Sequence, residues 1–194
     1  MLVLASASPR RQEILRNAGI PFAAHPTDIA EVPNPGEDPR LFAERMAKEK
    51  ALAVFRQRPH DVILGADTVV VVDQQILGKP QDQADAARML RLLSGRSHIV
   101  ITGVCLVGSE TGNQKMETSF QDVWSETTLV TMDPLSDADI RSYVATGEPM
   151  DKAGAYAIQG VASRWISRIE GDYFNVVGLP VALVWRMLRQ HGRV

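Results

Sequence analysis

Cysteine is almost absent from this chain of 194 residues. The single thiol, Cys105, allows no internal disulfide and no cysteine-based zinc cluster. No segment approaches the roughly 20 consecutive apolar residues that a membrane helix needs. The first five residues carry no basic stretch of the kind that begins a signal sequence. These absences predict a cytoplasmic protein that has no membrane partner and folds without covalent cross-links.

Neither sign of charge is in large excess. There are 21 Lys and Arg against 23 Asp and Glu, which gives a net charge of −2. A domain that binds nucleic acid usually has a marked basic excess, so we expect no nucleic-acid partner. The chain is 45% hydrophobic and 23% charged, as globular domains are. At this length we expect one domain, or at most a compact pair of lobes.

Strand patterns and helix patterns alternate along the chain. Helix starts are marked by Ser8-Pro9, by Asp38-Pro39 and by a capping box at Ser136. Apolar or alternating runs predict strands at residues 2–5, 62–72, 98–107, 120–132 and 165–169. Residues 171–178 predict a loop, and residues 108–116 predict a polar turn. Both βα and hairpin connections occur, so the pattern predicts an α/β protein with a mixed sheet.

Several common catalytic motifs are missing. The sequence has no Walker A loop, no dinucleotide-binding glycine motif, no H-E-x-x-H and no G-x-S-x-G. Its histidines lie far apart, without metal-ligand spacing, and we expect them at the surface or half-buried; they are His25, His60, His98 and His191. Cys105 lies in an apolar strand pattern and is expected to be an inert core thiol.

The first candidate site is Ser6-Ala7-Ser8-Pro9-Arg10-Arg11, which follows a predicted strand and begins a helix. A helix N-terminus offers free N–H groups and the positive end of the helix dipole, and both attract anions. Arginine is suited to bidentate phosphate contacts. We favour a phosphate-binding site here over a solvated helix end with two exposed arginines.

The second candidate is Gly65-Ala66-Asp67-Thr68, inside the strongest strand pattern. Four valines follow it, which indicates a central strand. An ionised carboxylate is costly to bury without a partner, so Asp67 predicts a cation, a metal ion or a cleft beside it. Gly65 interrupts the strand pattern and predicts close approach of a ligand. The alternative is an edge position with Asp67 facing water.

Three charged residues give weaker local signals. Lys79 is held extended by Pro80 one hairpin away from Asp67, but a surface turn has the same pattern. Lys50 falls on the apolar face of its predicted helix, where an ammonium needs a partner. Glu31, in a proline-rich connection, is either a metal-binding carboxylate or an ordinary loop acid.

The last candidate is residues 151–160, which are rich in glycine and alanine and end in Gln159-Gly160. Small residues leave backbone groups accessible, and the Gln159 amide carries both donors and an acceptor. This composition suits a pocket for a nucleobase. Taken alone, it also fits an ordinary tight loop.

In this order, these segments resemble the Maf family of nucleoside triphosphate pyrophosphatases. The matching pieces span nearly the whole chain; besides those quoted above they are Tyr143-Val144-Ala145-Thr146-Gly147-Glu148-Pro149 and Gly171-Asp172-Tyr173-Phe174-Asn175-Val176-Val177-Gly178-Leu179-Pro180. The resemblance implies one domain over residues 1–194 with an elongated, mixed-sheet Maf/ITPase-like fold and a cleft between two lobes. It also implies a homodimer.

The resemblance further implies a hydrolase that converts a nucleoside triphosphate to a monophosphate and pyrophosphate with a divalent metal cation, Mg²⁺ or Mn²⁺. By the resemblance Asp67 is the catalytic proton acceptor or holds the metal together with Glu31. The residues matching phosphate ligands are Ser8, Arg11, Lys50 and Lys79, and those matching specificity positions are Arg10, Thr68 and Gln159.

Thr68 and Gln159 match the branch of the family that acts on dTTP and UTP. An amide can pair with the imide edge of a pyrimidine through a donor and an acceptor together. An acidic residue at the later position, as in the branch acting on 7-methyl-GTP, would suit a cationic base better. We therefore expect hydrolysis of dTTP and UTP, with nucleotide-pool cleansing as the role. The alternatives are hydrolysis of 7-methyl-GTP or another modified nucleotide, and a nucleotide-binding regulator of cell division without turnover.

Overall fold

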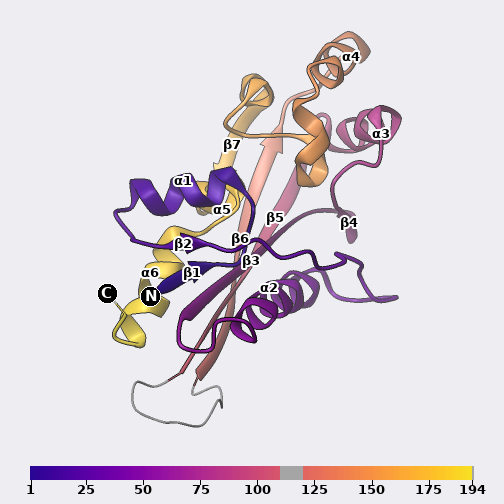
Figure 1. Cartoon of the computed structure of the whole chain (residues 1–194). Coiled ribbons are helices and arrows are strands. Elements are labelled where there is room, and N and C mark those ends of the chain that lie inside the picture. Colours follow the sequence, from indigo (N-terminus) through magenta and orange to yellow (C-terminus); the bar gives the residue numbers. More distant parts are fainter. Residues whose placement is uncertain (110–119, 194) are drawn as a thin grey trace. The chain divides into compact units, whose positions relative to one another are not determined.

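The computed structural model describes residues 1–109 and 120–193, and within them seven strands form one sheet (Figure 1). The strand order is β2-β1-β3-β5-β6-β7, with β4 paired to β3. Strand β1 runs parallel to β2 and β3, whereas β7 runs antiparallel to β6, which confirms the expected mixed α/β fold. The strands are β1 (Leu2–Leu4), β2 (Ala23–Ala24), β3 (Val62–Val72), β4 (Gln75–Leu77), β5 (Ser97–Gly108), β6 (Phe120–Met132) and β7 (Ile166–Glu170).

The helix start signals in the sequence are confirmed. Ser8 accepts a hydrogen bond from the N–H of Arg11, Asp38 accepts from two N–H groups of the next helix, and Ser136 forms a capping box with Asp139. The helices are α1 (Pro9–Asn17), α2 (Pro39–Phe55), α3 (Gln83–Leu93), α4 (Asp137–Ala145), α5 (Tyr173–Val177) and α6 (Val181–Gln190). None of the helices described, over 1–109 and 120–193, is long and apolar enough to cross a membrane.

The expectation of a loop at residues 171–178 is wrong, because this segment contains the short helix α5. The carboxylate of Asp172 accepts hydrogen bonds from the N–H groups of Phe174 and Asn175, at 2.7 and 3.3 Å, and so caps the helix. The helix has only five residues, too few to show a helical pattern in the sequence. Most of the expected polar turn at 108–116 lies outside the described residues.

The chain divides into two compact units, each built from separated segments. Unit 1 is Met1–Asp67, Thr102–Glu126 and Gly178–Val194, and unit 2 is Thr68–Ile101 and Thr127–Val177. The three long strands β3, β5 and β6 each contribute residues to both units.

In unit 1, helix α2 lies directly against β3 and β5 (Figure 1). A Cβ on Gly65 would lie 2.1 Å from the carbonyl oxygen of Ala47, and one on Gly103 would lie 2.3 Å from that of Ala43. Only glycine leaves room for the helix backbone at these distances. The expectation that Gly65 admits a ligand is therefore wrong, since the space beside it is filled by α2.

The single thiol belongs to the same apolar core. Cys105 is fully buried beside Ala47, Ala51 and other apolar side chains of unit 1. Burial raises the pKa of the Cys105 thiol to about 12, so it stays protonated and unreactive at neutral pH. The expected inert core thiol is confirmed.

In unit 2, helices α3 and α4 pack side by side over a core that includes Val70, Leu90 and Tyr143 (Figure 1). One histidine is part of this unit's interior. His98 is buried, and its Nε2 lies 2.7 Å from the hydroxyl of Tyr156, so the expected surface or half-buried position is wrong for this residue. Burial lowers the pKa of His98 to about 4.

Replacing Gly65 tests the contact between α2 and the sheet. Gly65→Ala should lower the free energy of unfolding by about 3 kcal/mol or more, because the new methyl group overlaps the backbone of α2. Gly78→Ala is the control, since no atom lies within 4 Å of its added methyl group. Urea denaturation of the two variants measures the difference. Equal stabilities would contradict the proposed close contact.

The buried histidine predicts a loss of stability in acid. An unfolded histidine takes up a proton near pH 6.5, whereas His98 in the folded chain does so only near pH 4. The unfolded state therefore binds more protons between these values, and the free energy of unfolding falls by up to about 3 kcal/mol as the pH drops through them. In His98→Gln this part of the pH dependence should vanish, and in the exposed control His60→Gln it should persist, as urea titrations at several pH values would reveal.

Candidate active site

Three charged side chains of unit 1 meet beneath helix α2. Side chains alternate between the two faces of a strand, so Gly65 and Asp67 share the face of β3 that α2 covers. The Nζ atom of Lys50, on α2, lies 2.5 Å from Asp67 Oδ1 and 2.5 Å from Glu31 Oε1. Asp67 and Lys50 are both buried. The structure thus brings together three of the residues singled out in the sequence.

The surroundings of Asp67 set its protonation. Burial raises the pKa of Asp67, while the positive charges of Lys50 and Arg11 act in the opposite direction. Burial also lowers the pKa of Arg11, and the carboxylates of Asp67 and Glu31 oppose that change. A buried carboxylate with a raised pKa can accept a proton, and the two cations near it, Lys50 and Arg11, can attract an oxyanion.

The junction between β1 and α1 completes the group in unit 1. Arg11 is buried, and its Nε donates to the carbonyl of Gly178 at 2.7 Å while its Nη1 donates to Ser6 Oγ at 3.2 Å. The N–H of Ser8 also donates to Ser6 Oγ, at 3.2 Å. These bonds fix the guanidinium and the first turn of α1 in one arrangement. Arg10, next to Arg11 in this turn, is half-buried.

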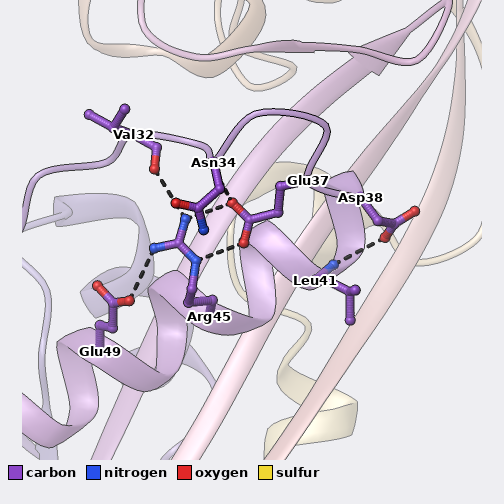
Figure 2. Close-up of polar contacts among 7 residues, drawn as sticks. All are labelled: Val32, Asn34, Glu37, Asp38, Leu41, Arg45 and Glu49. Carbon is purple, nitrogen blue, oxygen red and sulfur yellow. Dashed lines mark hydrogen bonds and ion pairs between the residues drawn. The ribbon is translucent and has the colours of Figure 1, made fainter.

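A second arginine holds the connection that carries Glu31 (Figure 2). Arg45, on α2, donates to both oxygens of Glu37 at 2.7 Å, to Glu49 at 3.0 Å and to the carbonyl of Val32 at 3.1 Å. The pair with Arg45 lowers the pKa of Glu37 to about 2. Sequence reasoning missed Arg45 and Glu37; their only signal was an arginine eight residues after a glutamate at the end of a proline-rich connection.

The donor set in unit 1 fits a hard divalent cation that is shared with a substrate. Mg²⁺ commonly binds one or two protein carboxylates together with substrate phosphates and water. Asp67 and Glu31 supply two carboxylates, and both of them contact the ammonium of Lys50. Over residues 1–109 and 120–193 no cluster of three or more His, Cys, Asp or Glu could hold a metal by itself. Two carboxylates would therefore leave most of the coordination sphere to phosphate oxygens and water.

Unit 2 holds the other predicted site residues. Thr68 follows Asp67 on β3 and points to the opposite face of the strand. Lys79 is exposed on the turn after β4. Gly154 donates its N–H to the carbonyl of Gly78 at 3.1 Å, so the Lys79 turn and the segment that leads to Gln159 lie against each other.

Gln159 is exposed within a tight turn in which the N–H of Gly160 donates to the carbonyl of Ala157 at 3.1 Å. Two side chains that sequence reasoning missed, Tyr143 and Glu148, bind the backbone on both sides of this turn. The sequence signal that could have found them is that both lie in residues 143–149, one of the segments that resemble the Maf family.

Comparison with known proteins identifies the chain's relatives. The family described as Maf-like protein matches residues 1–191. The chain belongs to this family. Similar members are the dTTP/UTP pyrophosphatases of Koribacter versatilis, 54% identical over 98% of this chain and 94% of that protein, and of Syntrophomonas wolfei, 50% identical over 97% and 96%. The resemblance to the Maf family found in the sequence is confirmed.

A solved structure shares the fold of this Maf-like chain. The Staphylococcus aureus Ham1 protein matches it with a TM-score of 0.50 and 12% sequence identity, over 98% of both chains. At this identity the likeness concerns the fold alone.

The Arg45 contacts predict how Glu37 titrates. In the unaltered protein Glu37 should titrate at about pH 2, because the guanidinium stabilises its charged form. Arg45→Met should raise the pKa of Glu37 most of the way toward its ordinary value near 4.5, because only the hydrogen bonds from Asn34 then stabilise the charged form; NMR of the side-chain carboxyl carbons would measure the change. Arg16→Met, which removes an exposed arginine bonded to Gln12, is the control and should leave Glu37 unchanged. An ordinary pKa for Glu37 in the unaltered protein would contradict the contact.

Proposed function

We propose that this Maf-like protein hydrolyses dTTP and UTP to the nucleoside monophosphate and pyrophosphate, by attack of water at the α-phosphorus. The observation that carries the proposal is the buried Asp67, which is paired with Lys50 at 2.5 Å and also feels the positive charge of Arg11 in the first turn of α1. The names of relatives about 50% identical over nearly the whole chain support the reaction and its substrates.

In this proposal Asp67 takes the proton of the attacking water. Its raised pKa makes it a better proton acceptor than an exposed aspartate. Arg11 and Lys50, together with Ser8 at the N-terminus of α1, would bind the phosphates and stabilise the charge that develops on their oxygens. Lys79, on the turn after β4, is a further phosphate ligand in this proposal.

A divalent cation, Mg²⁺ or Mn²⁺, would be held by Asp67 and Glu31. When bound, it would neutralise phosphate charge and favour ionisation of a nearby water. The ammonium of Lys50 lies 2.5 Å from an oxygen of each carboxylate, so both carboxylates already bind one positive charge. Arg45 fixes the connection that carries Glu31, so it would act as a positioning residue for this ligand.

The choice of base rests on Thr68, Gln159 and Arg10. The exposed Gln159 amide offers a donor and an acceptor to the imide edge of thymine or uracil. The homodimer, the cytoplasmic location and the role in nucleotide-pool cleansing stay predictions.

Replacing Asp67 tests the proposed chemistry. Pyrophosphate release is measured with Mg²⁺ or Mn²⁺ and a panel of dTTP, UTP, CTP, ATP, GTP and 7-methyl-GTP. We expect selective turnover of dTTP and UTP, and a loss of about 10²- to 10⁴-fold in kcat for Asp67→Asn because the proton acceptor is removed. Asp73→Asn is the control, since this aspartate is exposed and paired with Arg96.

Three results would contradict parts of the proposal. Near-normal turnover by Asp67→Asn would overturn the role of Asp67. A preference for 7-methyl-GTP would keep the chemistry and overturn the choice of base. Binding of triphosphates without pyrophosphate release would make the protein a nucleotide-binding regulator.

A further inference from the structure

The turn that carries Gln159 is bound on both sides by one pair of side chains. The N–H of Ala157, at the start of the turn, donates to the hydroxyl of Tyr143 at 3.2 Å. That hydroxyl donates to Glu148 Oε1 at 2.8 Å. The N–H of Val161, just after the turn, donates to the same Oε1 at 3.1 Å. Tyr143 and Glu148 therefore link the two ends of residues 157–161, and we call this pair the clasp.

The clasp is itself fixed in place. Tyr143 is buried on α4, with its ring edge-to-face with Trp165. The Gly160 backbone lies directly against Glu148, because a Cβ on Gly160 would fall 2.1 Å from Oε1. A buried ring and a close backbone contact leave the carboxylate little freedom. The two residues in the middle of the turn are Ile158 and Gln159. Ile158 is buried, whereas Gln159 is exposed to solvent.

We infer that Tyr143 and Glu148 are positioning residues that fix the approach of Gln159 to the base, and so set the preference for thymine and uracil over cytosine. This inference rests on the role proposed above for Gln159. The amide can place its donor and its acceptor on the imide edge of thymine or uracil together only when the main chain of residue 159 lies at the right distance and angle. The clasp holds this main chain on both sides of Gln159.

Removing the Tyr143 hydroxyl tests the inference. Tyr143→Phe keeps the buried ring but leaves the Ala157 N–H and Glu148 without their shared partner. The ratio of kcat/KM for dTTP to that for CTP should fall about tenfold, mainly through a higher KM for dTTP, with kcat for dTTP within about twofold. Glu148→Ala should have the same effect. Glu148→Gln retains Oε1, which accepts from the Tyr143 hydroxyl and from the Val161 N–H, and loses only the longer bond of 3.3 Å from the same N–H to Oε2. It should keep the ratio within about threefold of the unaltered enzyme.

Tyr156→Phe is the matched control. It also deletes one hydroxyl from a buried tyrosine of unit 2, but that hydroxyl is bonded to His98 and not to the clasp. The dTTP to CTP ratio should therefore be unchanged. Thermal unfolding of every variant is recorded so that the kinetics are compared only among proteins folded at the assay temperature.

A double-mutant comparison separates positioning from general stability. In a Gln159→Ala background the ratio should already be low, and adding Tyr143→Phe should lower it no further, because the clasp acts through Gln159. An equal fall in both backgrounds, or a fall in kcat for dTTP and CTP alike with the ratio preserved, would overturn the inference.

The single variants distinguish the two proposals. An unchanged ratio in Gln159→Ala would overturn the base-reading role of Gln159, and with it the role of the clasp. A low ratio in Gln159→Ala together with an unchanged ratio in Tyr143→Phe would overturn the clasp alone.

Discussion

The close approach of helix α2 to the sheet is the constraint on which the candidate site in unit 1 depends. The helix backbone reaches β3 and β5 only because Gly65 and Gly103 carry no side chain where it crosses. At that distance Lys50 reaches Asp67 two residues beyond Gly65, and the opposite charges of the pair offset much of the cost of burial. A bulkier residue at either glycine would separate the helix from the carboxylate.

The same helix also fixes the second carboxylate. Arg45 lies on α2, five residues before Lys50, and binds the connection next to Glu31 through Val32 and Glu37. Buried ion pairs are seldom a gain in stability over apolar residues of equal size, because both charges lose their hydration. The buried pair of Lys50 and Asp67, with the exposed carboxylate of Glu31 bound to the same ammonium, is therefore better accounted for by chemistry than by folding.

Local signals in the sequence predicted the elements well and their contacts poorly. The boundaries of β3 and the starts of α1, α2 and α4 follow from apolar runs and capping residues, which act over a few positions. The neighbouring sequence could not show why residue 65 is glycine, because the backbone that fills the space beside it belongs to a helix some twenty residues earlier in the chain. His98 was misjudged for the same reason, since its partner Tyr156 is 58 residues away.

Among the residues of the candidate site, too, the sequence predicted those with a local signal and missed those defined by distant contacts. Asp67 and Lys50 were found because a charge in an apolar pattern needs a partner, whatever that partner is. Arg45, Tyr143 and Glu148 were missed because each supports another functional residue by hydrogen bonds to backbone groups, and such bonds leave no mark in composition or periodicity.

In the proposed reaction water attacks the α-phosphorus of a bound triphosphate, and isotope labelling shows which phosphorus atom is attacked. Hydrolysis of dTTP is carried out in water enriched in the heavy isotope oxygen-18, and the masses of the products are measured by mass spectrometry. The heavy oxygen should enter the nucleoside monophosphate, and the pyrophosphate should stay unlabelled. Label in the pyrophosphate, or formation of a nucleoside diphosphate and free phosphate, would contradict it.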